Sequence, residues 1–234
     1  MESDGLNGLE KKRVKLAMIP SLLVVALIWL AFVIDHTAVF GNEFSKFGIY
    51  PGVIKGLRGI LFSPLLHSSF SHLWSNTLPL LIQIWLLFYF YRNIAFPTFI
   101  YLWLLSGIIT WIIGRSSYHI GASGLVFALL FFLFFSGVLR RYIPLIAVSL
   151  VVAFIYGSTV WSIFPIAELV DISISWEGHL SGAISGLVIA VIFRKQGPQR
   201  PAKIWVEEDE EDDMDKESED EEIENIDIGI GDSI

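Results

Sequence analysis

The chain contains no cysteine, which excludes a disulfide framework and a thiol nucleophile. It also has no H-E-x-x-H sequence, the motif that membrane metalloproteases usually carry. No repeated polar pattern that could form a ring is visible, which argues against a channel. What the chain does have is long hydrophobic runs, with 54% apolar residues and a mean hydropathy of +0.62. These values are typical of a protein that crosses a membrane several times.

Six apolar runs approach or reach the roughly 20 residues that cross a hydrocarbon core of about 30 Å. They are residues 17–35, 73–91, 95–113, 123–139, 143–160 and 179–194. The last two are short, which is acceptable where protein surrounds them. The first run is too long for a signal peptide and no A-x-A site follows it, so we expect an uncleaved span. The expected fold is an all-α bundle of six transmembrane helices.

The connection between the first and second spans, residues 36–71, is long. It contains prolines and glycines but also many aromatic and aliphatic residues, which makes it too apolar for disorder. We therefore expect an ordered extracytoplasmic loop beside the bundle.

Charge is distributed very unevenly along the chain. Residues 207–234 hold 16 of the 24 acidic residues and one lysine, so their net charge is −15 and that of the remaining 206 residues is +7. Such an acidic segment cannot bury enough apolar surface to fold alone. We expect a cytoplasmic lead at residues 1–16, one membrane domain at 17–195 and a disordered acidic tail at 196–234.

The basic residues also predict the orientation of the spans. An even number of crossings puts both termini on one side, and most lysines and arginines of the membrane domain flank the spans on that side. The positive-inside rule therefore makes both termini cytoplasmic. We expect a multi-pass protein of a bacterial-type plasma membrane.

Two glycine-flanked polar residues stand at the heads of apolar runs. Ser123 lies in the sequence Gly-Ala-Ser-Gly, and His179 lies in Gly-His-Leu-Ser-Gly. A serine and a histidine at such positions could act as a nucleophile and a base inside the bilayer. The free amides at the start of a helix could stabilise the oxyanion that the attack forms. Glycines 178, 182 and 186 recur every four residues and would let two helices approach closely. Ordinary packing of small residues remains the alternative.

A second polar group lies at the start of the second span. His72 and Asn76 are four residues apart and share a helix face, with His67 shortly before them. This stripe is compatible either with function or with polar contacts that hold helices together. The second, fourth and sixth spans all begin on the extracytoplasmic side, so these residues, Ser123 and His179 are expected at one depth. For the interfacial His36 and His119 we expect no role.

Three motifs therefore occur in order: His67-x4-His72-x3-Asn76, Gly121-x-Ser123-Gly124 and Gly178-His179-x2-Gly182. Their combination over residues 17–195 resembles the rhomboid family of intramembrane serine proteases. The resemblance implies that Ser123 is the nucleophile and His179 its base. It also implies an oxyanion hole formed by Asn76, His72 and the Ser123 amide. Residues expected to support this site are His67, Gly121, Gly124, Phe127 and Gly182.

The resemblance also implies a substrate class. Transmembrane segments of other membrane proteins would be cut near their extracytoplasmic end, in contact with lipid and without a cofactor or a metal. No nucleic-acid partner is expected, and the oligomeric state stays open.

The sequence departs from the family pattern at two places. Leu57 and Arg58 stand where a Trp-Arg pair is common, with the arginine one residue off the usual spacing, so no role is assigned to Arg58. Phe127 replaces a tyrosine, which leaves a ring to pack on His179 but no hydroxyl. Asp171 and Glu177 are near His179 in sequence, but we expect both to be solvated and the dyad to be oriented by packing.

Two other functions fit parts of the pattern. A catalytically inactive rhomboid-like membrane binding protein would use the same fold without hydrolysis. A membrane metal hydrolase could use His67, His72, His179 and Asp171 as ligands, but would leave the glycine-flanked serine unexplained.

Overall fold

The computed structural model describes residues 2–37, 43–165 and 175–201. The chain divides into two units, residues 1–200 and 201–234, and the helices of the described residues lie in the first. Over the described ranges the protein is all-helical and contains no strand, although Ile49 and His119 form one isolated antiparallel bridge. The all-α class predicted from the hydropathy is confirmed. The acidic tail lies outside the described residues, apart from its first few positions.

Four helices are long and apolar enough to cross a membrane: α1 (Glu2–Asp35), α3 (Phe70–Phe90), α4 (Ala95–Ile113) and α5 (Ser123–Arg140). Two more apolar helices, α6 (Ile143–Tyr156) and α7 (Trp176–Ile192), are shorter. Each expected span thus has a helix, and two helices fall below membrane-crossing length. The fifth expected span is shorter than predicted, because α6 ends at Tyr156 and the 3-10 helix η4 (Gly157–Ile163) follows.

Helix α1 covers both the expected lead at residues 1–16 and the first expected span. It is continuous from Glu2, so the polar lead and the first span form one helix. Near its polar end the Arg13 guanidinium lies 4.8 Å from the centre of the Tyr89 ring, and Tyr89 donates a hydrogen bond of 2.8 Å to Glu10. These contacts join the lead to the end of α3.

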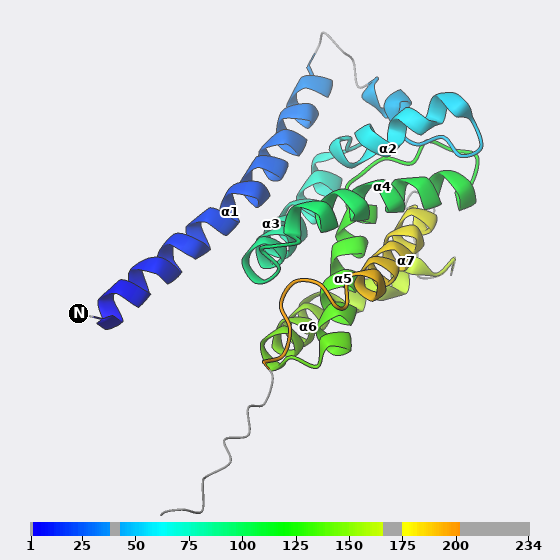
Figure 1. The fold of residues 1–234 in the computed structure, drawn as a ribbon. Helices are drawn as coiled ribbons and strands as arrows, with labels where there is room; N and C mark the ends of the chain where they lie inside the picture. The colour runs from blue at the N-terminus through cyan, green and yellow to red at the C-terminus, as the bar shows by residue number, and fades with distance from the viewer. Residues whose placement is uncertain (1, 38–42, 166–174, 202–234) are drawn as a thin grey trace, which may run out of the picture. The chain divides into compact units, whose positions relative to one another are not determined.

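Helix α5 is the centre of the bundle (Figure 1). It contacts α3, α4, α6 and α7. Of its most apolar 18 residues 61% are buried, whereas the corresponding share of α1, which packs mainly on α3, is 17%. Leu125, Leu129, Phe132 and Leu133 of α5 are almost wholly buried. The helix that begins with Ser123 is therefore held on all sides, which fixes the position of its first residue.

Helices α5 and α7 approach each other through glycine. A Cβ atom on Gly182 would overlap the carbonyl oxygen of Gly124, and one on Gly186 would overlap that of Ala128. A Cβ on Gly124 would lie 3.2 Å from the Gly178 carbonyl oxygen. The small-residue ridge of α7 thus packs directly on the backbone of α5, as its spacing predicts.

The loop between α1 and α3 is structured where it is described. It contains three 3-10 helices, η1 (Phe44–Phe47), η2 (Ile54–Arg58) and η3 (Ser63–Leu65), and the short helix α2 (Gly59–Phe62). Arg58 Nη2 donates a 2.8 Å hydrogen bond to the Lys46 carbonyl, and its guanidinium lies 4.5 Å from the Phe47 ring centre. Arg58 therefore holds this loop together.

At the opposite end of α5, the buried Arg140 binds the chain that follows α7. Its Nη2 donates to the carbonyls of Phe193 (2.6 Å) and Gln196 (2.7 Å), and its Nη1 bonds Ser136. A cation is favourable at a helix carboxyl end, where carbonyl groups lack helical donors.

Replacing Arg140 with methionine is expected to destabilise the fold by about 3 kcal/mol, because hydrogen bonds from a charged donor are lost and carbonyls stay buried. Thermal unfolding in detergent measures this. The neighbouring Arg141 is exposed, so Arg141→Met is the control and should unfold close to the wild type. Equal unfolding temperatures for the two variants would show that the hydrogen bonds of Arg140 do not stabilise the fold.

Candidate active site

Ser123 is the first residue of α5, and an unusual turn precedes it. Gly121 has φ +108°, which a residue with a side chain rarely adopts, and its amide donates a 2.9 Å bond to the Ser63 carbonyl. A Cβ atom on Gly121 would lie 2.5 Å from His72 Nε2. Glycine is thus required by the backbone angle, and a side chain here would also displace the neighbouring imidazole. The Ser123 amide stands at the helix start, where N–H groups have no helical acceptor.

His179 lies in the first turn of α7 and is 6% exposed. Phe127, one turn after Ser123 on α5, stacks on its ring with centroids 4.4 Å apart and planes inclined by 15°. Residues four apart share a helix face, so Ser123 and Phe127 face the same side of α5. The face of α5 that presents Ser123 is therefore the face that packs on His179.

The hydrogen bonds of His179 determine which ring nitrogen is free. Its Nδ1 lies 3.2 Å from the Ser162 carbonyl oxygen and 2.9 Å from the Ser162 hydroxyl. A carbonyl only accepts hydrogen bonds, so in the neutral ring Nδ1 carries the hydrogen and Nε2 keeps its lone pair. Ser162 of η4 thus takes the orienting place that a carboxylate occupies in a catalytic triad.

No hydrogen bond joins Ser123 to His179 among the bonds of the described residues. In the absence of substrate, catalytic hydrogen bonds are often long and tighten only in the reacting complex.

His72 and Asn76 lie at the start of α3, and the His72 ring is close to Gly121 in the turn before Ser123. The Ser69 hydroxyl caps this helix by accepting from the His72 amide at 3.2 Å. Asn76 is buried, and its Nδ2 donates to the His72 carbonyl at 2.9 Å, which leaves one further N–H on that amide. The His72 ring lies over Gly121, as described above.

His67 is almost completely buried and packs edge-on against His72, with ring centres 5.0 Å apart. It precedes α3 and lies outside the helical span. Burial, assisted by the neighbouring His72 and opposed by the Leu65 backbone, lowers the pKa of His67 from 6.5 to about 4. The neutral ring is therefore the form that fits the fold.

This lowered pKa predicts an acid-sensitive fold. Between about pH 6.5 and pH 4 the unfolded chain binds a proton at His67 that the folded chain does not, so stability falls as the pH falls through that window. From pH 7.5 to pH 5 the loss at this residue is about 2 kcal/mol, since each unit of pKa difference is worth about 1.4 kcal/mol. Thermal unfolding of the wild type and His67→Phe at both pH values measures it.

The His67→Phe variant should lose less stability on acidification than the wild type. His36 is exposed and bonds only locally, to the Phe32 carbonyl at 2.9 Å, so His36→Phe should behave like the wild type. An unchanged pH dependence in His67→Phe would contradict the assignment.

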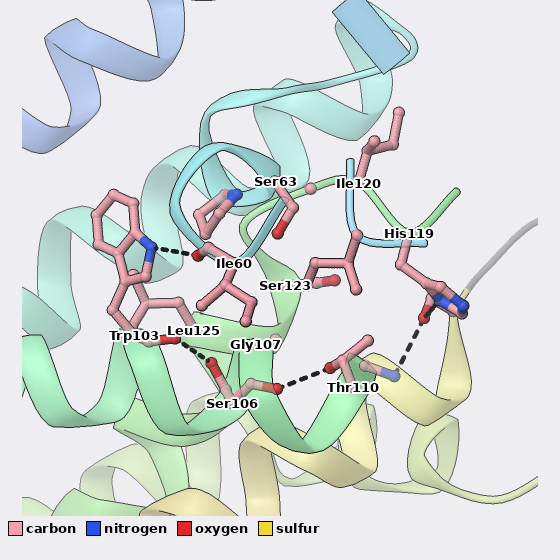
Figure 2. Close-up of a pocket in the computed structure, with 16 residues that line it drawn as sticks. Ile60, Ser63, Trp103, Ser106, Gly107, Thr110, His119, Ile120, Ser123 and Leu125 are labelled. Atoms are coloured by element: carbon pink, nitrogen blue, oxygen red, sulfur yellow. Dashed lines mark hydrogen bonds between the residues drawn. The ribbon is translucent and has the colours of Figure 1, made fainter. Parts of the chain in front are cut away.

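A small, partly open pocket lies beside Ser123 (Figure 2). Its lining combines apolar side chains with the hydroxyls of Ser63, Ser106, Thr110 and Ser123 itself. It is enclosed by the loop before α3, by α4 and by the starts of α5 and α7. His72, Asn76 and His179 do not line it. The pocket therefore gives the serine a partly polar space at the start of α5.

One expectation about polar residues is wrong. Glu177 is 3% exposed instead of solvated, because the start of α7 packs on the connection between α4 and α5, where Arg115 lies 3.7 Å from its carboxylate. His119 is 5% exposed, and both of its ring nitrogens make hydrogen bonds. His36 is exposed. Asp171 lies outside the described residues, and within them no three His, Asp or Glu side chains are grouped as metal ligands.

Sequence reasoning missed two residues that position His179. Ser162 lies 17 positions before it in an irregular segment, and no motif marks it. Ser175 caps α7 by accepting from the Gly178 amide at 3.1 Å. A serine three residues before the first glycine of the Gly-His-Leu-Ser-Gly motif is a recognisable capping signal that could have been used.

Comparison with known proteins gives a consistent result. The family model described as Rhomboid domain matches residues 54–196. The chain is 37% identical over 192 residues to "Uncharacterized protein Rv1337" of Mycobacterium tuberculosis, covering 78% of this chain and 76% of that protein. It is 34% identical over 193 residues to "Uncharacterized protein ML1171" of Mycobacterium leprae, covering 78% and 72%. The residues matched by the family model, 54–196, include all three sequence motifs.

Proposed function

Because the chain belongs to the rhomboid family, we propose that this multi-pass membrane protein is an intramembrane serine endopeptidase. It cleaves transmembrane segments of other membrane proteins near their extracytoplasmic end. The observation that carries the proposal is the Nδ1 contact of His179 with the Ser162 carbonyl, which leaves Nε2 free as a base on the helix face beside Ser123.

The reaction follows from these groups. Ser123 Oγ attacks the substrate carbonyl and gives its proton to His179 Nε2, and the oxyanion is stabilised by the Ser123 amide, Asn76 and His72. The peptide C–N bond then breaks, and the imidazolium returns the proton to the leaving amine. Water then attacks the acyl-enzyme carbonyl and gives a proton to His179 Nε2. The ester bond to Ser123 breaks, and the imidazolium returns the proton to Ser123 Oγ. Each oxyanion donor contributes about a hundredfold or more to the rate.

The substrate must be locally unwound. A helix hides its carbonyls in hydrogen bonds, and exposing them inside a bilayer is costly, so residues that weaken a helix are expected near the cut. The basic residues around the spans support cytoplasmic termini, which would put Ser123 toward the extracytoplasmic leaflet of a bacterial-type plasma membrane.

The proposal is tested with purified protein in liposomes and a single-span substrate carrying a helix-weakening segment near its extracytoplasmic end. Mass spectrometry of the products should locate one cut in that segment, and the Ser123→Ala protein should give none. Cleavage that persists in Ser123→Ala, or cuts confined to the soluble part of the substrate, would contradict the proposal.

The two alternatives make different predictions in the same assay. A binding protein of this fold would retain the substrate without cutting it. A metal hydrolase would be stopped by a chelator and unaffected by a serine-directed isocoumarin, whereas the serine protease shows the opposite response.

A further inference from the structure

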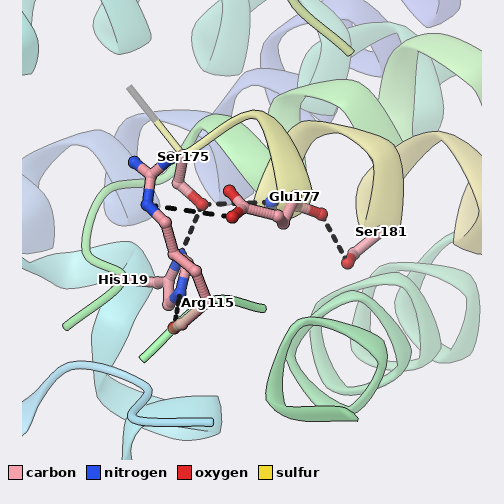
Figure 3. Close-up of polar contacts among 6 residues, drawn as sticks. Arg115, His119, Ser175, Glu177 and Ser181 are labelled. Carbon is pink, nitrogen blue, oxygen red and sulfur yellow. Dashed lines mark hydrogen bonds and ion pairs between the residues drawn. The ribbon is translucent and has the colours of Figure 1, made fainter. Parts of the chain in front are cut away.

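A polar cluster at the start of α7 joins two separate parts of the chain (Figure 3). Arg115 and His119 belong to the connection between α4 and α5, and Ser175 and Glu177 belong to the start of α7. His119 Nδ1 lies 2.6 Å from Ser175 Oγ, and Arg115 Nε lies 3.7 Å from Glu177 Oε1. We refer to these four residues as the clasp.

The hydrogen bonds of the clasp have a definite direction. His119 Nε2 lies 3.0 Å from the Arg115 carbonyl, which only accepts, so in the neutral ring Nε2 carries the hydrogen and Nδ1 accepts from the Ser175 hydroxyl. Ser175 Oγ in turn accepts from the Gly178 amide. A continuous chain of hydrogen bonds thus runs from the α4–α5 connection into the backbone of the first turn of α7.

The two side chains of the ion pair in the clasp differ in their exposure to solvent. The Glu177 side chain is 4% exposed, whereas that of Arg115 is 38% exposed. Glu177 Oε2 is also buried and makes no hydrogen bond to any residue that the structure describes. Taking away the arginine therefore leaves a charge buried without compensation, and taking away the carboxylate leaves a cation that water can reach.

The clasp connects the two halves of the candidate active site. His119 is four residues before Ser123, and Ser175 is four residues before His179. The same first turn of α7 places its Gly178 carbonyl against Gly124. A displacement of this turn would move the imidazole relative to the serine, and misplacement by about 1 Å costs about a hundredfold in rate.

We propose that the clasp, through the Arg115–Glu177 ion pair and the His119–Ser175 hydrogen bond, holds the first turn of α7 so that His179 lies in reach of Ser123. The four residues are positioning residues, which act through the first turn of α7. Glu177 is not the third member of a triad, since His179 Nδ1 is engaged by Ser162. The inference rests on the proposed protease function.

The test compares Glu177→Gln, Arg115→Gln, the double variant and Arg115→Lys in the full-length protein. We expect kcat to fall about tenfold in Glu177→Gln and about a hundredfold in Arg115→Gln, with KM within twofold of the wild type. The double variant should recover to the level of Glu177→Gln, because the uncompensated charge is gone. Arg115→Lys should recover most of the activity, since it keeps the charge.

The control is the ion pair between Lys46 and Glu43, which is 2.8 Å long and exposed on both sides. Lys46→Gln and Glu43→Gln should leave kcat unchanged, as surface pairs contribute little. The rate of fluorophosphonate labelling of Ser123, normalised to the folded fraction at the assay temperature, should follow kcat in every variant.

Failure of the clasp and failure of the protease proposal give different results. A wild type that neither cuts substrate nor labels at Ser123 overturns the proposed function. An active wild type with Arg115→Gln and Glu177→Gln within twofold in kcat overturns the clasp. So does a loss that appears only in KM, a loss that only follows the unfolded fraction, or a double variant no better than Arg115→Gln.

Discussion

Replacing Ser123 with alanine is expected to lower the rate of transmembrane peptide cleavage by about four orders of magnitude or more, to the background of the assay. The oxygen of this hydroxyl forms the covalent bond to the substrate, and alanine has no such atom. Cleavage of a single-span substrate in liposomes, followed over hours, measures the loss.

Replacing His179 with alanine should cost a similar factor, and the double variant should be no worse than either single variant. Residues that act as one unit give such strongly non-additive effects. The matched control is His36→Ala, since His36 is exposed and makes only a local hydrogen bond. Losses that multiply in the double variant would show that the two residues act independently.

Replacing Gly182 with alanine is the second change with a large expected effect. In an isolated helix the substitution would be favourable by about 1 kcal/mol. Here the added methyl group would overlap the Gly124 carbonyl and would lie 2.9 Å from Phe127 Cβ, so α7 must move away from α5. That movement separates His179 from Ser123, and we expect activity to fall about a hundredfold or more, with a lower unfolding temperature.

Gly157→Ala is the control for this prediction. A Cβ atom on Gly157 would meet nothing within 4 Å, and its backbone angles, φ −60° and ψ −30°, suit alanine. This variant should keep wild-type activity and stability. Equal activity of the Gly182→Ala and wild-type proteins would mean that the contact of α5 with α7 does not control the site.

The sequence was informative where a physical pattern is strong. Long apolar runs predict α1, α3, α4 and α5, because a bilayer requires a minimum helix length. Glycines spaced by four residues on α7 predict its approach to another helix, and the contact with Gly124 has this form.

The polar contacts around His179 could not be predicted in the same way. Glu177 resembles an ordinary solvated acid at a helix start, and its compensating residue, Arg115, is 62 positions away. Ser162 bonds His179 from a 3-10 segment whose path no periodicity reveals. Such contacts depend on tertiary packing between distant parts of the chain, so the local sequence does not predict them.

The central claim is that Ser123 is a nucleophile activated by His179. Its most direct test is to react the purified protein in detergent with a fluorophosphonate and to map the adduct by mass spectrometry. The account predicts one adduct, on Ser123, absent from Ser123→Ala and strongly reduced in His179→Ala. Labelling that persists in Ser123→Ala, or a wild-type protein whose Ser123 stays unmodified while substrate is cut, would contradict it.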